Sequence, residues 1–176
     1  IKIGERKVVV LDDDPTGTQT VHGIPVLTTW TVEALKQEFG QKTTAFYILT
    51  NSRSLPLNDA KKINKEIGHH LKVVSQIKGR DFVVISRSDS TLRGHFPGEI
   101  EALAQALKET FDGWLFIPFF LEGGRYTIGD IHYVEENGVL IPAGDTEERE
   151  GGPPRPAQAF PRQPPGRRGD PSDERS

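Results

Sequence analysis

The sequence predicts an α/β domain with a mainly parallel sheet flanked by helices, in a Rossmann-like three-layer arrangement. Apolar runs of strand length alternate with segments of helical periodicity, and 176 residues suffice for one domain with a real core. Each of four apolar runs is followed directly by charged and hydroxyl residues, in the clusters 12–17, 50–53, 87–94 and 122–125. Because parallel strands end at one edge of a sheet, these clusters are expected to meet there.

The first half of the chain is predicted to contain three strands and one helix. Lys7 to Leu11 and Ile24 to Thr28 have strand patterns around a turn rich in Gly and Thr. Thr31 is expected to cap a helix in which positions 32, 35 and 39 share an apolar face. Thr44 to Leu49 is the third predicted strand.

Two further helices and one strand are predicted in the middle of the chain. After Pro56, either Asn58 or Asp59 is expected to cap a long amphipathic helix over about 60–74. Phe82 to Ile85 is apolar throughout, which is typical of a strand covered on both faces. Pro97 is then expected to open the last helix, with an apolar stripe from position 100 to 111.

The remaining predictions concern the C-terminal third. Trp114 to Ile117 is predicted as another buried strand, and Asn137-Gly138 as the turn of a hairpin formed by 131–134 and 139–141. The predicted domain covers residues 1–147. Residues 148–176 are rich in Pro, Gly and Arg and are expected to form a disordered tail, either native or the product of a frameshift. The chain has no Met, so the natural start is expected to lie upstream.

Composition excludes several classes of function. A net charge of −3 and a pI near 6.0 give no electrostatic reason to bind nucleic acid or an anionic membrane. The longest apolar run, 114–121, is far shorter than the roughly 20 residues needed to cross a bilayer. The absence of Cys excludes disulfides and thiolate metal sites and favours the cytoplasm. With no HExxH, GxxxxGK[ST] or helix-opening GxGxxG, neither a bound metal nor a nucleotide site is expected in this chain.

The clearest candidate site is the acidic cluster at the end of the first strand. Three consecutive carboxylates beside a buried strand are costly unless a cation, a proton or a hydroxylated ligand shares the site. The alternative is an ordinary solvated turn, since Asp, Pro, Thr and Gly are common turn formers. The sequence favours the functional interpretation because later clusters supply complementary charges.

The cluster after the predicted strand Phe82 to Ile85 supplies those charges. Arg87 and Arg93 flank a run of Asp, Ser and Thr just before a helix, and guanidinium groups bind carboxylate or phosphate through paired donors. An anionic group is expected to dock here, although the two Arg residues could instead only neutralise nearby Asp residues. Arg53 and Arg125 are weaker candidates of the same kind.

Two of these clusters contain motifs that resemble those of a known protein family. Asp13-Asp14-Pro15-Thr16-Gly17 and Asp89-Ser90-Thr91-Leu92-Arg93-Gly94, each after a strand, are similar to the N-terminal, sugar-binding domain of the four-carbon acid sugar kinases. The stretches 49–54, 85–95 and 122–127 carry the same resemblance, which runs from about Lys7 to Thr146. Pro15 stands where many members carry Leu, so the resemblance does not define the substrate.

The resemblance implies the substrate half of an ATP-dependent kinase that phosphorylates erythronate, threonate or an oxo derivative. Family members bind ATP in a second domain, so ATP and Mg²⁺ are expected only with that domain and the isolated chain is expected to bind without catalysing. The carboxylate would meet Arg87 and Arg93, and the hydroxyls would meet Asp13, Asp14 and Asp89. The implied catalytic residue is Asp14 or Asp89. The implied substrate-binding residues are Asp13, Thr16, Gly17, Arg53, Arg87, Ser90, Thr91, Arg93, Gly94 and Arg125.

Two alternatives remain at this stage. Asp12, Asp14 and Thr16 match the DxDxT pattern of haloacid-dehalogenase-like phosphatases, with Asp12 as nucleophile and Asp14 as acid and base. The later acidic pair that should hold magnesium is missing, which weakens this alternative. The other alternative is a sugar-acid-binding module without catalysis. The expected partner is a small sugar acid, with neither nucleic acid nor membrane, and a homodimer stays open.

Overall fold

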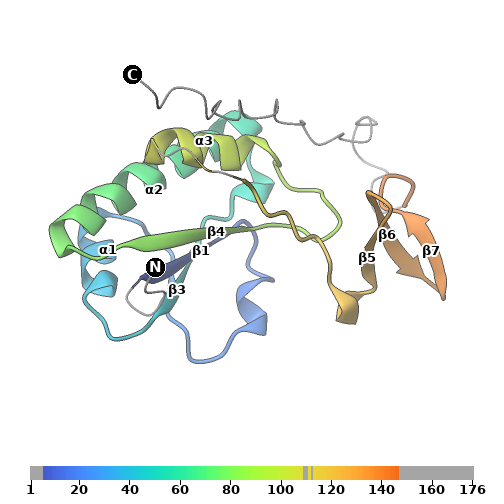
Figure 1. The fold of residues 1–176 in the computed structure, drawn as a ribbon, viewed down its shortest axis with the longest axis horizontal. Coiled ribbons are helices and arrows are strands. Elements are labelled where there is room, and N and C mark those ends of the chain that lie inside the picture. Colours follow the sequence, from blue (N-terminus) through green and yellow to red (C-terminus); the bar gives the residue numbers. More distant parts are fainter. Residues whose placement is uncertain (1–5, 109–110, 112, 147–176) are drawn as a thin grey trace, which may run out of the picture.

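A computed structural model describes residues 6–108, 111 and 113–146 of the chain (Figure 1). Its main feature is a parallel sheet of four strands in the order β2-β3-β1-β4, flanked by helices. The strands are β1 (Lys7–Asp12), β2 (Val26–Leu27), β3 (Ala45–Leu49) and β4 (Phe82–Arg87). The helices are α1 (Val32–Phe39), α2 (Leu57–Lys78) and α3 (Gly98–Leu107), and short 3₁₀ turns η2 (Thr18–Thr20), η3 (Ser52–Ser54) and η4 (Leu121–Gly123) lie in the connections. The predicted α/β class, with a parallel sheet flanked by helices, is therefore confirmed.

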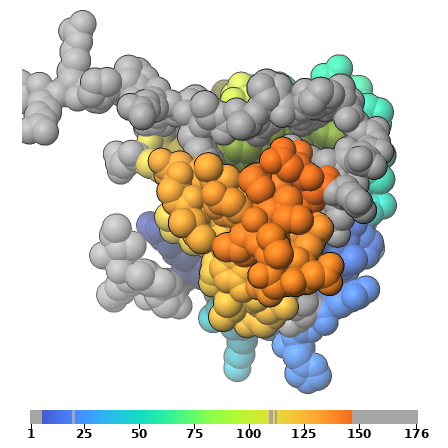
Figure 2. Space-filling model, turned by 90° about the vertical axis from the view of Figure 1, so that its right-hand side faces the viewer, coloured from blue at the N-terminus to red at the C-terminus, as the bar shows by residue number. Residues whose placement is uncertain are grey.

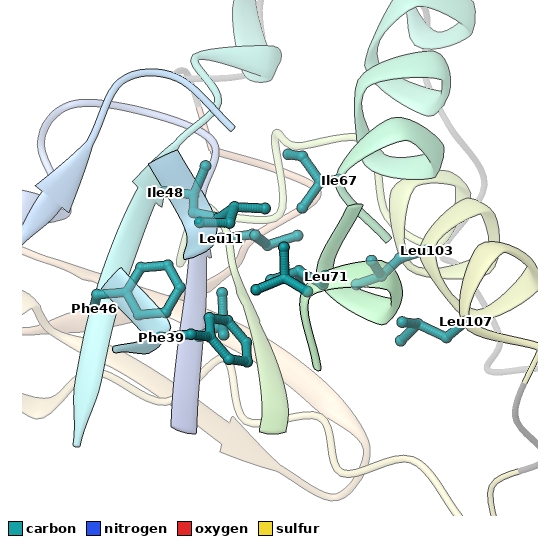
Figure 3. Packing of buried hydrophobic residues seen from close by; sticks show 11 residues of the cluster. Leu11, Phe39, Phe46, Ile48, Ile67, Leu71, Leu103 and Leu107 are labelled. Atoms are coloured by element: carbon teal, nitrogen blue, oxygen red, sulfur yellow. The ribbon is translucent and has the colours of Figure 1, made fainter. Parts of the chain in front are cut away.

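The hydrophobic core lies between the sheet and the helices (Figure 3). Alternate residues of β1 and β3 face this core, and α1, α2 and α3 all contribute to it. Its buried members are Val9, Leu11, Leu35, Phe39, Phe46, Ile48, Ile67, Leu71, Val74, Leu103 and Leu107. All three helices thus cover the same face of the sheet, and a helical layer on the other face is not found among the described residues.

This arrangement corrects the prediction that β4 is covered on both faces. In the described sheet β4 is an edge strand, because it pairs with β1 only. Val84 packs toward the helices, whereas Val83 and Ile85 on the opposite face are exposed. The continuous apolar run in β4 therefore predicted that both faces of the strand are covered. Within the described residues, only the face toward the helices is covered.

The helices begin close to the predicted positions. The Thr31 hydroxyl accepts the backbone N–H of Ala34 at 3.2 Å, as predicted for the cap of α1. Helix α2 begins directly after Pro56 instead of after Asn58 or Asp59, and Asp59 lies in its first turn. Helix α3 ends at Leu107, so the predicted stripe to position 111 is too long by one turn.

A second sheet of three antiparallel strands follows the first: β5 (Arg125–Ile128), β6 (Ile131–Glu136) and β7 (Val139–Pro142). The predicted hairpin is confirmed, because Asn137 and Gly138 both have the positive φ of a tight β6–β7 turn. Strand β5 was not predicted, although Gly129-Asp130 forms an equivalent turn between β5 and β6. This sheet lies to one side of the four-stranded sheet in Figure 1 and occupies the centre of the face in Figure 2.

Two of the predicted strands, 114–117 and 24–28, need correction. Trp114 to Ile117 is extended but joins neither sheet, and Leu115 is 88% exposed. Ring contacts of this stretch include Phe116 with Phe96, with centroids 4.7 Å apart, and Trp114 with Phe111, with centroids 6.3 Å apart. The predicted strand Ile24–Thr28 is shortened to β2. Apolar composition indicated burial in both cases, but a strand also requires a partner along its edge.

The predicted tail, 148–176, lies outside the described residues. None of the helices in the described part of the chain is both long and apolar enough to cross a bilayer.

The register of the central strands determines where the polar clusters lie. Asp12, the last residue of β1, pairs with Leu49 of β3 on one side and with Arg87 of β4 on the other. Three strands therefore end at the same level of the sheet, and the residues that follow them begin side by side.

Candidate functional site

Three of the four polar clusters converge at the carboxyl edge of β1, β3 and β4, as predicted. Backbone hydrogen bonds join the segments after these strands: Thr50 N–H donates to Asp12 O at 2.9 Å and Arg53 N–H donates to Asp13 O at 3.1 Å. Asp13 N–H also donates to Arg87 O at 3.4 Å. The fourth cluster does not follow a strand of this sheet, because Glu122 lies in η4 and Arg125 begins β5 of the second sheet.

Asp12 lies deepest in the site and has no exposed surface. Its Oδ1 accepts a hydrogen bond from Arg87 Nη1 at 3.0 Å, and its Oδ2 is buried without a hydrogen-bond partner. Burial raises the pKa of the Asp12 carboxyl, and the Arg87 guanidinium opposes that shift only in part. Gly17 packs over this pair, where a Cβ atom would overlap both side chains. A side chain at position 17 would therefore have to displace the Arg87 or Asp12 side chain, and glycine lets the loop close over the pair.

Asp13 is almost as deeply buried and is fully engaged with neighbours. Arg53 donates to it twice, from Nη2 to Oδ1 at 2.7 Å and from Nε to Oδ2 at 3.3 Å. The hydroxyl of Ser88 donates to Oδ2 at 2.6 Å. A Cβ atom on Gly94 would collide with Ser88 and lie 3.0 Å from Asp13 Oδ2, so this glycine also serves close packing. Asp13 thus orients Arg53, and its oxygens face protein donors.

Asp14 is the most accessible of the three consecutive carboxylates, with 26% of its side chain exposed. Its Oδ1 accepts the backbone N–H of Thr16 at 2.8 Å and the Thr16 hydroxyl at 2.5 Å. These hydrogen bonds lower the pKa of Asp14, so it is ionised at neutral pH. Its Oδ2 lies 3.4 Å from Arg53 Nη1.

Asp89 organises the loop after β4. Arg93 donates to it from Nε at 2.8 Å and from Nη2 at 2.9 Å, and the Thr91 hydroxyl and backbone N–H donate to Oδ2. Arg53 Nη1 lies 3.7 Å away. Burial of Asp89 opposes ionisation, but the hydrogen bonds from Arg93 and Thr91 outweigh it and hold the pKa far below its usual range. The Arg93 side chain remains 45% exposed.

The second sheet reaches this loop through His132. Its Nε2 lies 2.6 Å from Ser90 O, and its Nδ1 lies 3.1 Å from the Thr127 hydroxyl. Ser90 therefore contributes its backbone carbonyl, which holds the loop after β4 to β6. Arg125 donates to Gly123 O, and no hydrogen bond or ion pair within the described residues joins it to the acidic cluster.

Sequence patterns missed a buried polar network behind the site. Ser52 donates to Glu99 Oε1 at 2.5 Å, and Asn64 Nδ2 donates to the same oxygen at 3.0 Å. The Thr50 hydroxyl lies 2.9 Å from the Ser52 hydroxyl and donates to Asp12 O at 3.0 Å. The only sequence signal for Glu99 is an acidic residue in the first turn of a helix, which is common and not specific.

The site can bind an anion that also carries hydroxyl groups. The Arg87 and Arg93 side chains are 36% and 45% exposed, and guanidinium groups bind carboxylates through paired donors. Asp14 adds an accessible acceptor for hydroxyl groups. The phosphatase alternative fits poorly, because its nucleophile Asp12 is fully buried and paired with Arg87.

Comparison with known proteins agrees with this geometry. Residues 8–153 match the family described as sugar-binding N-terminal domain, which is the N-terminal domain of the four-carbon acid sugar kinases. The match covers most of the 176 residues, so the chain belongs to this family and carries a sugar-binding domain. It extends six residues past the predicted domain end at 147. No curated protein matches the chain significantly.

Proposed function

We propose that the chain binds a four-carbon sugar acid of the erythronate or threonate type and supplies the substrate half of an ATP-dependent kinase. The observation that carries this proposal is that partly exposed Arg87 and Arg93 and the accessible carboxylate of Asp14 all lie at or after the ends of strands that end at one edge of the sheet. A sugar acid has the complementary groups, since its carboxylate suits the guanidinium groups and its hydroxyls suit the carboxylate.

Within this proposal, Asp14 is the better candidate for the base that accepts the proton of the attacking hydroxyl. Asp89 has only 7% of its side chain exposed, and Arg93, Thr91 and Arg53 surround both of its oxygens. Its strongly lowered pKa also makes it a weak proton acceptor. The Asp14 side chain is 26% exposed, so Asp14 is assigned as the base and Asp89 is assigned to orient Arg93.

The remaining residues prepare the site. Asp12 holds Arg87, Asp13 holds Arg53, and Gly17 and Gly94 allow the loops to close on them. Bound ATP with Mg²⁺ would supply the transferred phosphoryl group, and positioning with charge stabilisation is most of what such a transfer needs. The sequence has no phosphate-binding glycine motif, so nucleotide binding is assigned to a separate domain and not to residues of this chain.

Titration calorimetry with erythronate and threonate tests the proposal. Wild-type protein should bind at least one of them, and the polyol erythritol, which lacks the carboxylate, should bind more weakly. Arg93→Ala should weaken binding by about 1.5–3 kcal/mol, the usual contribution of a hydrogen bond to a charged group. Arg80→Ala is the matched control, because Arg80 donates to Phe39 O and Gln41 O at the opposite edge of the sheet.

Unchanged affinity in Arg93→Ala would remove Arg93 from the site, and binding of neither acid would refute the proposed ligand class. The chain alone, given a sugar acid and MgATP, should form no phosphorylated product. Turnover under these conditions would contradict the assignment of ATP binding to another domain.

A further inference from the structure

Glu99 is a buried carboxylate that the proposed function does not use. It is 5% exposed and comes from the first turn of α3, whereas the site itself is built from the ends of β1, β3 and β4. Its side chain accepts hydrogen bonds from Ser52 and Asn64, which are also buried. Burying a carboxylate costs free energy unless its hydrogen-bond partners are well placed. The buried position of Glu99 therefore suggests a specific structural role.

Ser52 connects Glu99 to the residue that pairs with the acidic cluster. Ser52 opens the short turn η3, directly after Asn51, which has the left-handed φ of 53°. The next residue, Arg53, donates its backbone N–H to Asp13 O and its guanidinium to the Asp13 carboxylate. Fixing the Ser52 side chain therefore fixes the start of the turn from which Arg53 extends.

The same network reaches the end of β1. The Ser52 hydroxyl lies 2.9 Å from the Thr50 hydroxyl, and Thr50 donates to Asp12 O from both its hydroxyl and its backbone N–H. A hydroxyl has one proton, so the bond from Ser52 to Glu99 leaves its oxygen to accept from other donors. The single hydroxyl proton of Thr50 can then go either to Ser52 Oγ or to Asp12 O, and the Thr50 backbone N–H donates to Asp12 O in both cases.

We propose that Glu99 is a positioning residue, which through Ser52 holds the Arg53 turn against Asp13 and so sets the Arg53 guanidinium in the candidate site. The role in ligand binding rests on the proposed function. The positioning of Arg53 does not, because it follows from contacts of the described residues alone.

The test measures the Arg53 Nε–H group by NMR in the full chain, before any ligand is added. The Nε–H donates to Asp13, so its hydrogen exchange should be slow in the wild type. The signal is assigned with Arg53→Lys, which lacks it. In Glu99→Ala its exchange should be roughly tenfold faster, the effect of losing about one net hydrogen bond. Glu99→Gln keeps an oxygen acceptor and should restore most of the protection.

Two further variants separate positioning from general stability. Ser52→Ala removes the link to Arg53 but leaves the bond between Asn64 and Glu99, and it should reproduce the fast exchange even if Glu99→Ala folds poorly. Asn64→Leu removes the other bond to Glu99, and it should lower stability without changing Arg53 exchange. Unchanged Arg53 exchange in Ser52→Ala, or equal acceleration in Asn64→Leu, would overturn the positioning role.

Calorimetry with erythronate and threonate on the same variants then tests the connection to the ligand. If the wild type binds, Ser52→Ala should weaken binding and Asn64→Leu should not, and equal binding by all three would overturn the ligand role. If the wild type binds neither acid, the proposed function fails, and the NMR result still decides whether Glu99 positions Arg53.

Discussion

Lys7 begins β1 at the end of the sheet opposite the candidate site, and its side chain has no exposed surface. Its ammonium donates to Thr43 O at 2.5 Å, to the Thr43 hydroxyl at 2.9 Å and to Glu38 Oε1 at 3.3 Å. Burial lowers the pKa of Lys7, and the hydrogen bond with Glu38 opposes that shift. The charge is therefore held by specific partners whose removal should be costly.

The Lys7→Met variant tests this buried pair. Met fills similar space but cannot pair with Glu38, which stays buried, so the variant should lose about 3 kcal/mol of unfolding free energy in denaturant titration. Adding Glu38→Gln should recover most of the loss by removing the unpaired charge. The matched control is Lys62→Met, which breaks an exposed pair with Asp59 and should leave stability essentially unchanged. Equal losses of unfolding free energy in Lys7→Met and Lys62→Met would show that burial of the Lys7 pair does not matter for stability.

At the scale of elements, α2 packs closely against α3 around Gly68. Gly68 lies where a Cβ atom would come within 2.8 Å of Ala106 Cβ and 3.3 Å of Leu103 Cδ1. Glycine is unfavourable within a helix by roughly 1 kcal/mol relative to alanine. Its presence in the middle of α2 is therefore explained by close packing of the two helices and not by helix propensity.

Gly68→Ala should destabilise the protein despite the better helix propensity of alanine. Overpacking costs about 1–3 kcal/mol, which offsets or exceeds the propensity gain, and denaturant titration gives the net value. Ala106→Gly in the Gly68→Ala background should recover stability, because it removes the atom that is approached most closely. The control Gln76→Ala changes an exposed position of the same helix and should have little effect. A Gly68→Ala protein more stable than the wild type would refute close packing as the reason for this glycine.

Local patterns predicted those elements whose signals lie within a few residues. The Thr31 cap and the Asn137-Gly138 turn are examples, since each depends on a side chain or backbone preference close in sequence. Trp114 to Ile117 failed for the opposite reason. Its apolar character is a local property, whereas pairing as a strand depends on an edge supplied by another segment.

In the candidate site, too, the features with local sequence signals could be predicted and those that depend on distant segments could not. The convergence of Asp14, Arg53 and Arg87 could be predicted, because parallel strands end at one edge and each cluster directly follows a strand. The complete burial of Asp12 and the role of Glu99 could not. Both depend on distances between elements far apart in sequence, such as the 2.5 Å contact from Ser52 to Glu99.

At the scale of the whole molecule, His132 joins the two sheets. The carbonyl of Ser90 can only accept a hydrogen bond, so His132 Nε2 carries the proton in this contact. In the neutral ring Nδ1 then accepts from the Thr127 hydroxyl of β5. One side chain of β6 thus connects the antiparallel sheet to the loop that contains Asp89.

His132→Phe should loosen this connection while keeping a ring of similar size. Without the donor, Ser90 O loses its partner, a loss of about 1 kcal/mol at this partly exposed position. Hydrogen exchange followed by mass spectrometry should therefore accelerate in peptides of 125–142, while peptides of β1 and β3 stay protected. Thr127→Val is the control, because it removes the bond to Nδ1 and leaves the contact with Ser90 in place. If exchange in 125–142 were unchanged in His132→Phe, the second sheet would be held by its apolar contacts and not by this histidine.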